Sequence, residues 1–147
     1  DRDARGCHVG AAPTSLRLAH DGAALLVAFR TLDFWATPLS AGETWGVDDG
    51  IRFTLAGHAF EAYFSGNVYA VDAEGRRTPL AGAYNAVDAR GGMARSRIVE
   101  CRIPFAALGI APARGARIAF SACRWSAHYR EARHYAAPGE TAELVLE

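Results

Sequence analysis

The sequence predicts an all-β fold, an antiparallel β-sandwich of two sheets with about eight to ten strands and at most one or two short helical turns. Apolar and polar residues alternate with a period of two in many short segments. Turn-forming Gly, Asp and Pro residues separate those segments. The 31 alanines would ordinarily favour helices, but no 3.6-residue period accompanies them. They are better explained as small residues that fit between two packed sheets.

Eight segments carry the strand pattern. They cover residues 15–20, 24–31, 50–56, 58–64, 67–72, 97–103, 117–123 and 142–147. The His20-Asp21-Gly22 turn is expected to join the first two segments as a hairpin. A single helical turn is expected from Pro104 to Gly109, because Pro favours the start of a helix and Gly its end. Residues 82–94 are expected to form a loop that contains at most a short edge strand.

Alternation also assigns side chains to the two faces of a strand. In segments 50–56 and 58–64 it places Phe53 and Phe60 in the core. Arg52, Glu61 and Tyr63 then share the opposite face, which we expect to be exposed to solvent.

The three cysteines give no CxxC motif and leave open both free thiols and one disulfide. Cys101 shares a face with Val99 and Ile103 and is expected to be buried. Cys123 has the opposite parity to the apolar positions of its strand and is expected to face away from the core. These orientations disfavour a disulfide between Cys101 and Cys123, and Cys7 adds no further constraint.

The charge composition excludes several function classes. Sixteen Arg balance sixteen Asp and Glu, Lys is absent, and the net charge is zero. We expect no nucleic-acid partner, which usually requires a basic face, and no lysine-based catalysis. No apolar run is long enough to span a membrane. We expect one domain over residues 1–147, with a weak strand or extended segment in residues 1–14. Because no initiator Met is present, we also expect the chain to begin as a trimmed or excised segment.

Catalytic and metal-binding patterns are weak. Asp48 and Asp49 are the only adjacent acidic pair and precede a strand, where turn formation explains them, so we expect no enzyme. They are also the weak candidates for a structural calcium site, and no cofactor is required. Cys123, His128 and His134 match no common zinc spacing, and the two histidines are expected in an irregular segment.

Aromatic residues at junctions between loops and strands suggest a binding function. Trp45 precedes the segment at residue 50, and Tyr135 precedes the last strand. Such rings can stack on the C–H faces of a sugar, while planar polar side chains bind its hydroxyls. The polar candidates are Arg52, Glu61, Tyr63, Arg124 and His134. Packing that anchors the loops is an equally good interpretation of the two rings.

Four segments, in order, resemble the family 9 carbohydrate-binding modules and their DOMON-like relatives. They are residues 16–29 with Asp21 in the turn, 45–53 (WGVDDGIRF), 100–109 (ECRIPFAALG) and 135–138 (YAAP) leading into 144–146. The third is the most specific, since it matches E-x-x-I-P-F-x-x-L-G. The chain departs from the family at Arg52 or Ile51, where a Glu is usual, and at Thr141 and Ala142, where Phe-Gly is usual.

The resemblance implies a β-sandwich that holds a sugar between two aromatic rings, here Trp45 and Tyr135. It also implies a non-catalytic, secreted or extracytoplasmic module that accompanies a glycan-active enzyme domain and in many relatives holds structural calcium. Two alternatives stay open. A haem-binding electron carrier of the same fold would use Met93 with a histidine, although the absence of Lys removes one common ligation. The other is a structural or interaction domain without a ligand.

Overall fold

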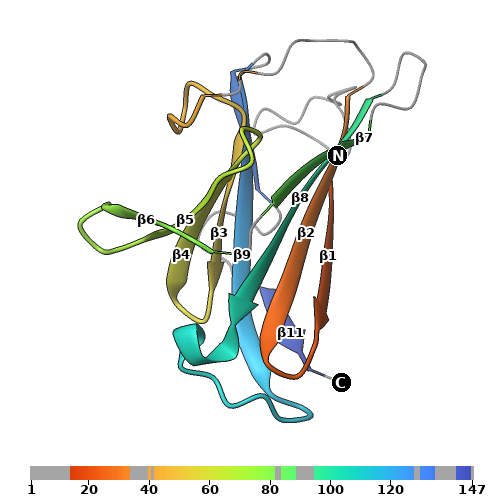
Figure 1. Ribbon diagram of the computed structural model, residues 1–147, viewed down its shortest axis with the longest axis vertical. Helices are drawn as coiled ribbons and strands as arrows, with labels where there is room; N and C mark the ends of the chain where they lie inside the picture. Colours follow the sequence, from red (N-terminus) through yellow and green to blue (C-terminus); the bar gives the residue numbers. More distant parts are fainter. Residues whose placement is uncertain are drawn as a thin grey trace.

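The computed structural model describes residues 14–33, 40, 42–81, 84–88, 95–127, 130–134 and 142–146. Over these ranges it contains eleven strands and one 3₁₀ turn, arranged as two antiparallel sheets that face each other (Figure 1). The predicted antiparallel β-sandwich is therefore confirmed, with slightly more strands than expected.

The first sheet has four strands in the order β1-β2-β8-β7. These strands are β1 (Thr14–His20), β2 (Ala24–Asp33), β8 (Arg95–Pro104) and β7 (Tyr84–Asp88). β7 falls in the region expected to be mainly loop, and it forms the short edge strand that the sequence allowed there. The 3₁₀ turn η1 (Phe105–Leu108) follows β8 as expected and ends at Gly109 in the left-handed conformation.

The second sheet has seven strands. It contains β10 (Glu131–His134), β9 (Arg117–Ser126), β3 (Gly50–Leu55), β4 (His58–Tyr63), β5 (Val68–Val71) and β6 (Arg77–Pro79) in this order, and β11 (Ala142–Val145) also pairs with β9. The long strand β9 is central, since β3 pairs with one of its edges and β10 and β11 share the other. β5 and β6 form a hairpin that projects from the side of the sandwich (Figure 1).

The core lies between the two sheets and follows the predicted alternation. The rings of Phe29 and Phe53 are 5.2 Å apart, and those of Phe53 and Phe60 are also 5.2 Å apart. Phe29 comes from the four-stranded sheet and the other two from the seven-stranded sheet, so these rings join the two layers. All three side chains are buried.

The cysteine predictions are confirmed within the described residues. Cys101 is buried, Cys123 is partly exposed, and neither forms a disulfide bond. Burial raises the pKa of Cys101 to about 12, so its thiol stays protonated at neutral pH. Cys7 lies outside the described residues.

No helix in the described part of the chain is long and apolar enough to cross a membrane.

The turn between β1 and β2 depends on Asp21. Its Oδ1 accepts hydrogen bonds from the backbone N–H groups of Ala23 and Ala24, at 2.9 and 2.8 Å, and Gly22 adopts a φ of 84°. Arg102 on β8 donates to Oδ2 at 3.0 Å. The turn residue therefore also ties the hairpin to the neighbouring strand.

Asp21 should make the stability of the domain depend on pH between about 4 and 2. The hydrogen bonds from Ala23, Arg102 and Ala24 lower the pKa of Asp21 from 3.8 to about 2. A carboxyl group with a lowered folded-state pKa stabilises the fold above its unfolded pKa, and this contribution is lost as the pH falls through the folded value. The difference in unfolding free energy between the wild type and Asp21→Asn should therefore shrink from about pH 4 to about pH 2. Urea unfolding across this range measures it, and a constant difference would contradict the prediction.

Candidate functional site

The outer face of the seven-stranded sheet, which points away from the core, carries three of the seven predicted site residues. Cross-strand pairing places Cys123, Arg52, Glu61 and Tyr69 in one row across β9, β3, β4 and β5. The next row contains Trp125, Gly50 and Tyr63. Three residues predicted from separate segments, Arg52, Glu61 and Tyr63, are therefore neighbours on one face.

The prediction that this face is open to solvent is wrong for two of these residues. Glu61 is only 4% exposed and Tyr63 is fully buried. The guanidinium of Arg77, on the projecting β6, lies 5.9 Å from the ring centre of Tyr63, and Arg52 covers Glu61 from β3. Gly50 gives Tyr63 room, because a Cβ atom there would lie 3.1 Å from the tyrosine ring. Neighbouring side chains thus form a second, polar layer over this part of the sheet.

Glu61 is the centre of that polar layer. Arg52 donates to Oε1 of Glu61 through Nε at 3.0 Å and also through Nη2. The Tyr63 hydroxyl donates to Oε2 at 2.7 Å, and Nη1 of Arg77 lies 3.8 Å from the same oxygen. Burial and the contact with Glu61 raise the pKa of Tyr63, so its hydroxyl remains a donor. The buried carboxylate is therefore neutralised and hydrogen-bonded on both oxygens.

Trp45 lies beside this layer in a tight turn. Val47 and Asp48 donate backbone hydrogen bonds to the Thr44 carbonyl at 3.0 and 2.8 Å, and Gly46 takes the positive φ of 82° that the turn requires. The Trp45 side chain is partly exposed. The Cζ atom of Arg52 lies 4.4 Å from the centre of its ring, which is a close cation–π contact.

Asp48 and Asp49 fasten the segment that carries Trp45. Asp48 accepts hydrogen bonds from the Ser40 hydroxyl and from the Thr44 N–H, and these bonds lower its pKa. Asp49 accepts from the backbone N–H groups of Ser40 and Ala127, at 3.1 and 3.2 Å. The described residues contain no group of three or more His, Cys, Asp and Glu side chains placed to hold a metal. The two carboxylates therefore have a structural role in the turn, and a calcium site stays a prediction.

Glu43 is a further residue of this region, and the sequence did not place it at the sugar site. Its carboxylate accepts hydrogen bonds from the Ser65 and Tyr69 hydroxyls, at 2.7 and 2.6 Å, and from the Asn67 amide. Its backbone carbonyl accepts from Nη1 of Arg77 at 2.6 Å. Hydrogen bonds, that from Tyr69 foremost, lower the pKa of Glu43 and keep it charged. Alternation in β5 could have identified Tyr69, but nothing in the sequence pattern marks Glu43 or Arg77.

The position of Arg124 differs from the prediction. β9 continues three residues beyond the expected end, and its register pairs Arg124 with Ile51 on the core side of the sheet. Arg124 is only 2% exposed there. It therefore lies on the opposite face from Arg52 and does not share a surface with Trp45.

The remaining predicted site residues are only partly covered by the structure. His134 belongs to β10 and pairs in register with Cys123, which places its backbone next to the Arg52 row. Tyr135, the predicted second ring, lies outside the described residues, as do Met93 and His128.

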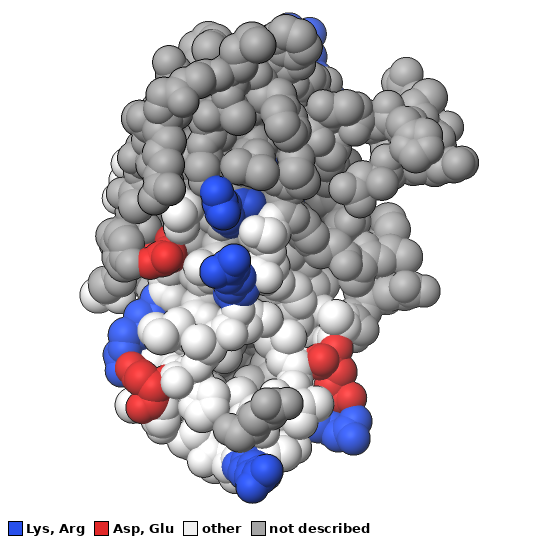
Figure 2. Space-filling model, turned by 90° about the vertical axis from the view of Figure 1, so that its right-hand side faces the viewer, with Lys and Arg blue, Asp and Glu red and all other residues white. Residues whose placement is uncertain are grey.

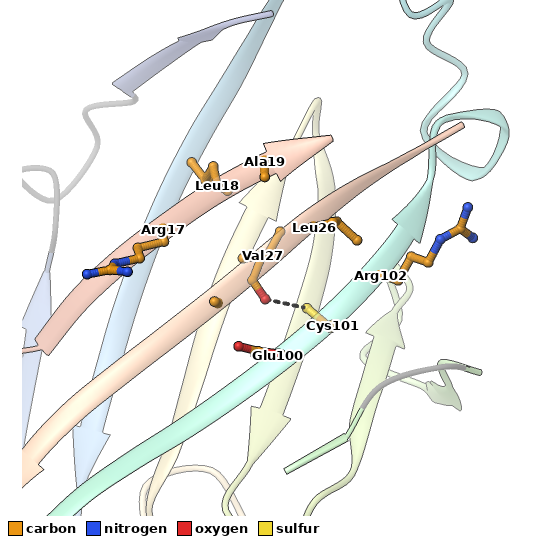
Figure 3. Close-up of a pocket in the computed structure, with 9 residues that line it drawn as sticks. Arg17, Leu18, Ala19, Leu26, Val27, Glu100, Cys101 and Arg102 are labelled. Atoms are coloured by element: carbon orange, nitrogen blue, oxygen red, sulfur yellow. Dashed lines mark hydrogen bonds between the residues drawn. The ribbon is translucent and has the colours of Figure 1, made fainter. Parts of the chain in front are cut away.

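A second candidate region is a depression on the outer face of the four-stranded sheet. It has a volume of about 500 Å³. In the strand register Leu26 on β2 lies between Ala19 of β1 and Arg102 of β8, and these side chains line the depression (Figure 3). The molecule seen from the β1 side shows arginine side chains near the middle of the described surface (Figure 2). None of the described residues that line the depression is aromatic, so they offer no ring for stacking. Trp45 and its neighbours remain the better candidate.

Comparison with known proteins identifies the fold. No protein-family profile and no curated protein sequence matches the chain. Among solved structures, a family 9 carbohydrate-binding module from Caldicellulosiruptor kristjanssonii matches at 17% identity in complexes with cellotriose and with glucose, with TM-scores of 0.55 and 0.56, over 95% of this chain and 77% and 78% of that chain. A candidate carbohydrate-binding protein from Bacteroides uniformis matches at 15% identity, with a TM-score of 0.56, over 92% of this chain and 79% of that chain. The chain therefore has the β-sandwich fold of the family 9 carbohydrate-binding modules.

Proposed function

We propose that this domain is a non-catalytic module that binds carbohydrate by stacking a sugar ring on Trp45. The observation that carries the proposal is a partly exposed tryptophan held in a tight turn against a hydrogen-bonded polar layer. A fixed aromatic face beside N–H donors suits a sugar, which presents C–H groups on its ring faces and hydroxyls around its edge. The solved structures with this fold, which include modules in complex with cellotriose and glucose, give independent support.

The charges beside Trp45 favour a neutral sugar. Arg52 and Arg77 lie beside the charged carboxylates of Glu61 and Glu43, so these four described side chains together carry no net charge to attract an ionic ligand. The Arg77 side chain is 40% exposed, which leaves part of its guanidinium available to hydroxyl groups.

The proposal assigns the second ring to Tyr135 and a supporting polar contact to His134. It makes the domain an accessory of a secreted glycan-active protein, as the resemblance implies. In this assignment Glu61 and Tyr63 support the site from below and do not touch the ligand, because both are buried.

Replacing Trp45 with alanine should reduce the affinity for a bound oligosaccharide by about 30-fold or more. Aromatic hot-spot residues contribute about 2 kcal/mol or more to binding, which corresponds to that factor. Isothermal titration calorimetry with glucose and cellotriose, followed by an affinity-gel screen of other neutral glycans, measures the effect. Far-UV circular dichroism should show an unchanged fold, since the Trp45 side chain is not part of the core.

Val47→Ala is the matched control for this experiment. Val47 lies in the same turn and is 63% exposed, so its truncation removes apolar surface near Trp45 without removing a ring. It should leave the affinity within about twofold. If the wild-type domain binds no glycan in the screen, or if Trp45→Ala binds as tightly as Val47→Ala, the proposed function is wrong.

A further inference from the structure

Arg52 contacts both Trp45, which the sequence predicted as a stacking ring, and Glu61, which it predicted as a polar contact of the sugar. Its guanidinium lies 4.4 Å from the Trp45 ring centre and, at the same time, donates to Oε1 of Glu61. A planar guanidinium can stack on an aromatic face and bind a carboxylate through its edge, which an ammonium group cannot do as well. The contacts of Arg52 are therefore directed toward Trp45 and Glu61 within the domain.

We propose that Arg52 is a positioning residue for Trp45 and not a direct contact of the ligand. Its guanidinium covers one face of the indole ring, holds the ring in a single orientation and leaves the opposite face for a sugar. The inference that a sugar binds to the opposite face rests on the proposed function. The inference that Arg52 orients the Trp45 ring is independent of that function.

The buried Glu61 carboxylate on the sheet anchors the Arg52 guanidinium. Glu61, its carboxylate partner, is buried and is itself held by the Tyr63 hydroxyl and by Arg77. The position of the guanidinium is thus determined by groups on β4 and β6, and its stem by β3. A side chain fixed at both ends can transmit that rigidity to the ring that it covers.

The backbone on the Trp45 side is anchored separately. Glu43, two positions before Trp45, binds Ser65, Asn67 and Tyr69, and Asp48 binds Thr44 just before the ring. The turn is therefore fixed without Arg52. What Arg52 adds is the orientation of the side chain, because no other cation–π or ring–ring contact of Trp45 occurs within the described residues.

A fixed ring has two consequences for binding. The ligand does not have to immobilise the indole, and immobilising a mobile side chain would otherwise lower the affinity by about 3- to 10-fold. Trp45 also presents only one face, so a single sugar ring can stack on it, with any second aromatic residue facing it from across the sugar.

The test is fluorescence quenching by acrylamide, which reports how accessible each tryptophan is. Arg52→Met keeps most of the aliphatic stem but removes the guanidinium, and should increase the quenching of Trp45. The Trp45 contribution is obtained by comparing each protein with its Trp45→Phe counterpart. Arg52→Lys keeps the charge without the planar fork and should give an intermediate increase. Arg76→Met is the matched control, because Arg76 pairs with Asp72 and Glu74 in the projecting hairpin and should leave quenching unchanged.

Binding is measured on the same proteins by calorimetry with cellotriose. Arg52→Met should weaken the affinity by about 3- to 10-fold, less than Trp45→Ala, and Arg52→Lys should recover part of the loss. Unchanged quenching of Trp45 in Arg52→Met overturns the inference, whether or not sugar binds. Increased quenching with unchanged affinity overturns the link to the ligand. If the wild type binds no sugar, the proposed function fails, while the quenching result still decides the role of Arg52.

Discussion

Replacing Phe53 with alanine should lower the free energy of unfolding by about 3–5 kcal/mol, which is the range for a fully buried phenylalanine. Phe53 is 1% exposed, and its ring centre lies 5.2 Å from that of Phe29 in the facing sheet and 5.2 Å from that of Phe60 on the neighbouring strand of its own sheet. Its loss opens a cavity in the contact that joins the sheets, and it also removes two favourable aromatic pairs. Equilibrium unfolding in urea, monitored by tryptophan fluorescence and circular dichroism, measures the effect.

Val47→Ala provides the reference for this measurement. Val47 is also apolar but is 63% exposed, so its truncation should change stability by about 0.5 kcal/mol or less. If Phe53→Ala cost no more than Val47→Ala, the two sheets would not pack through this ring. Phe60→Ala should give a loss of similar size to Phe53→Ala, because its side chain is 4% exposed and stacks on the Phe53 ring.

The residues on the inner face of the sandwich were predictable because the packing of each strand against the facing sheet determines them. Alternation assigns every second residue to the core wherever a strand has a buried and an exposed side, and Phe53, Phe60 and Cys101 follow this rule. The hairpin turn at Asp21 and the 3₁₀ turn ending at Gly109 were also predictable, since both depend on the local conformational preferences of a few residues.

The ends and partners of strands were less predictable. β6 and β10 were missed because three or four mostly polar residues carry no pattern of their own, and they become strands only by pairing with β5 and β9. Arg124 shows the same limit. It has the parity of Ile118 and Phe120, so the correct face was implied, but only if β9 continued past Cys123.

The outer face was the least predictable part of the candidate site. Glu61 and Tyr63 have the outward parity that the sequence suggested, yet both are buried. The side chains that cover them are Arg52 from the neighbouring strand β3 and Arg77 from the β5–β6 hairpin. The odd or even position of a residue along a strand predicts the side of the sheet to which it points. Whether the residue is buried on that side depends on side chains from other strands, which no local pattern describes.

Replacing Glu61 with alanine should lower the free energy of unfolding by about 2–3 kcal/mol. Removing the carboxylate leaves the buried Tyr63 hydroxyl without its acceptor, and an unsatisfied buried polar group costs about 1–3 kcal/mol. Arg52 and Arg77 also lose their shared partner, but they are 46% and 40% exposed and can be hydrated. The decrease in the free energy of unfolding should therefore be smaller than the roughly 3–5 kcal/mol that is typical of breaking a fully buried ion pair. Chemical unfolding at neutral pH measures it.

Two further variants show whether the buried hydroxyl is the cause. Glu143→Ala removes an exposed carboxylate that pairs with Arg117, and should cost under about 1 kcal/mol, as surface ion pairs do. In the double variant Glu61→Ala with Tyr63→Phe, the unsatisfied hydroxyl is absent, so the combined loss should be clearly smaller than the sum of the two single losses. Additive losses would mean that the Tyr63 hydroxyl does not depend on Glu61, and a loss as small as that of Glu143→Ala would mean that Glu61 is exposed in solution. Since Glu61 binds the guanidinium that lies against Trp45, Glu61→Ala should also increase the acrylamide quenching of Trp45, which connects the stability of the polar layer to the ring of the proposed binding site.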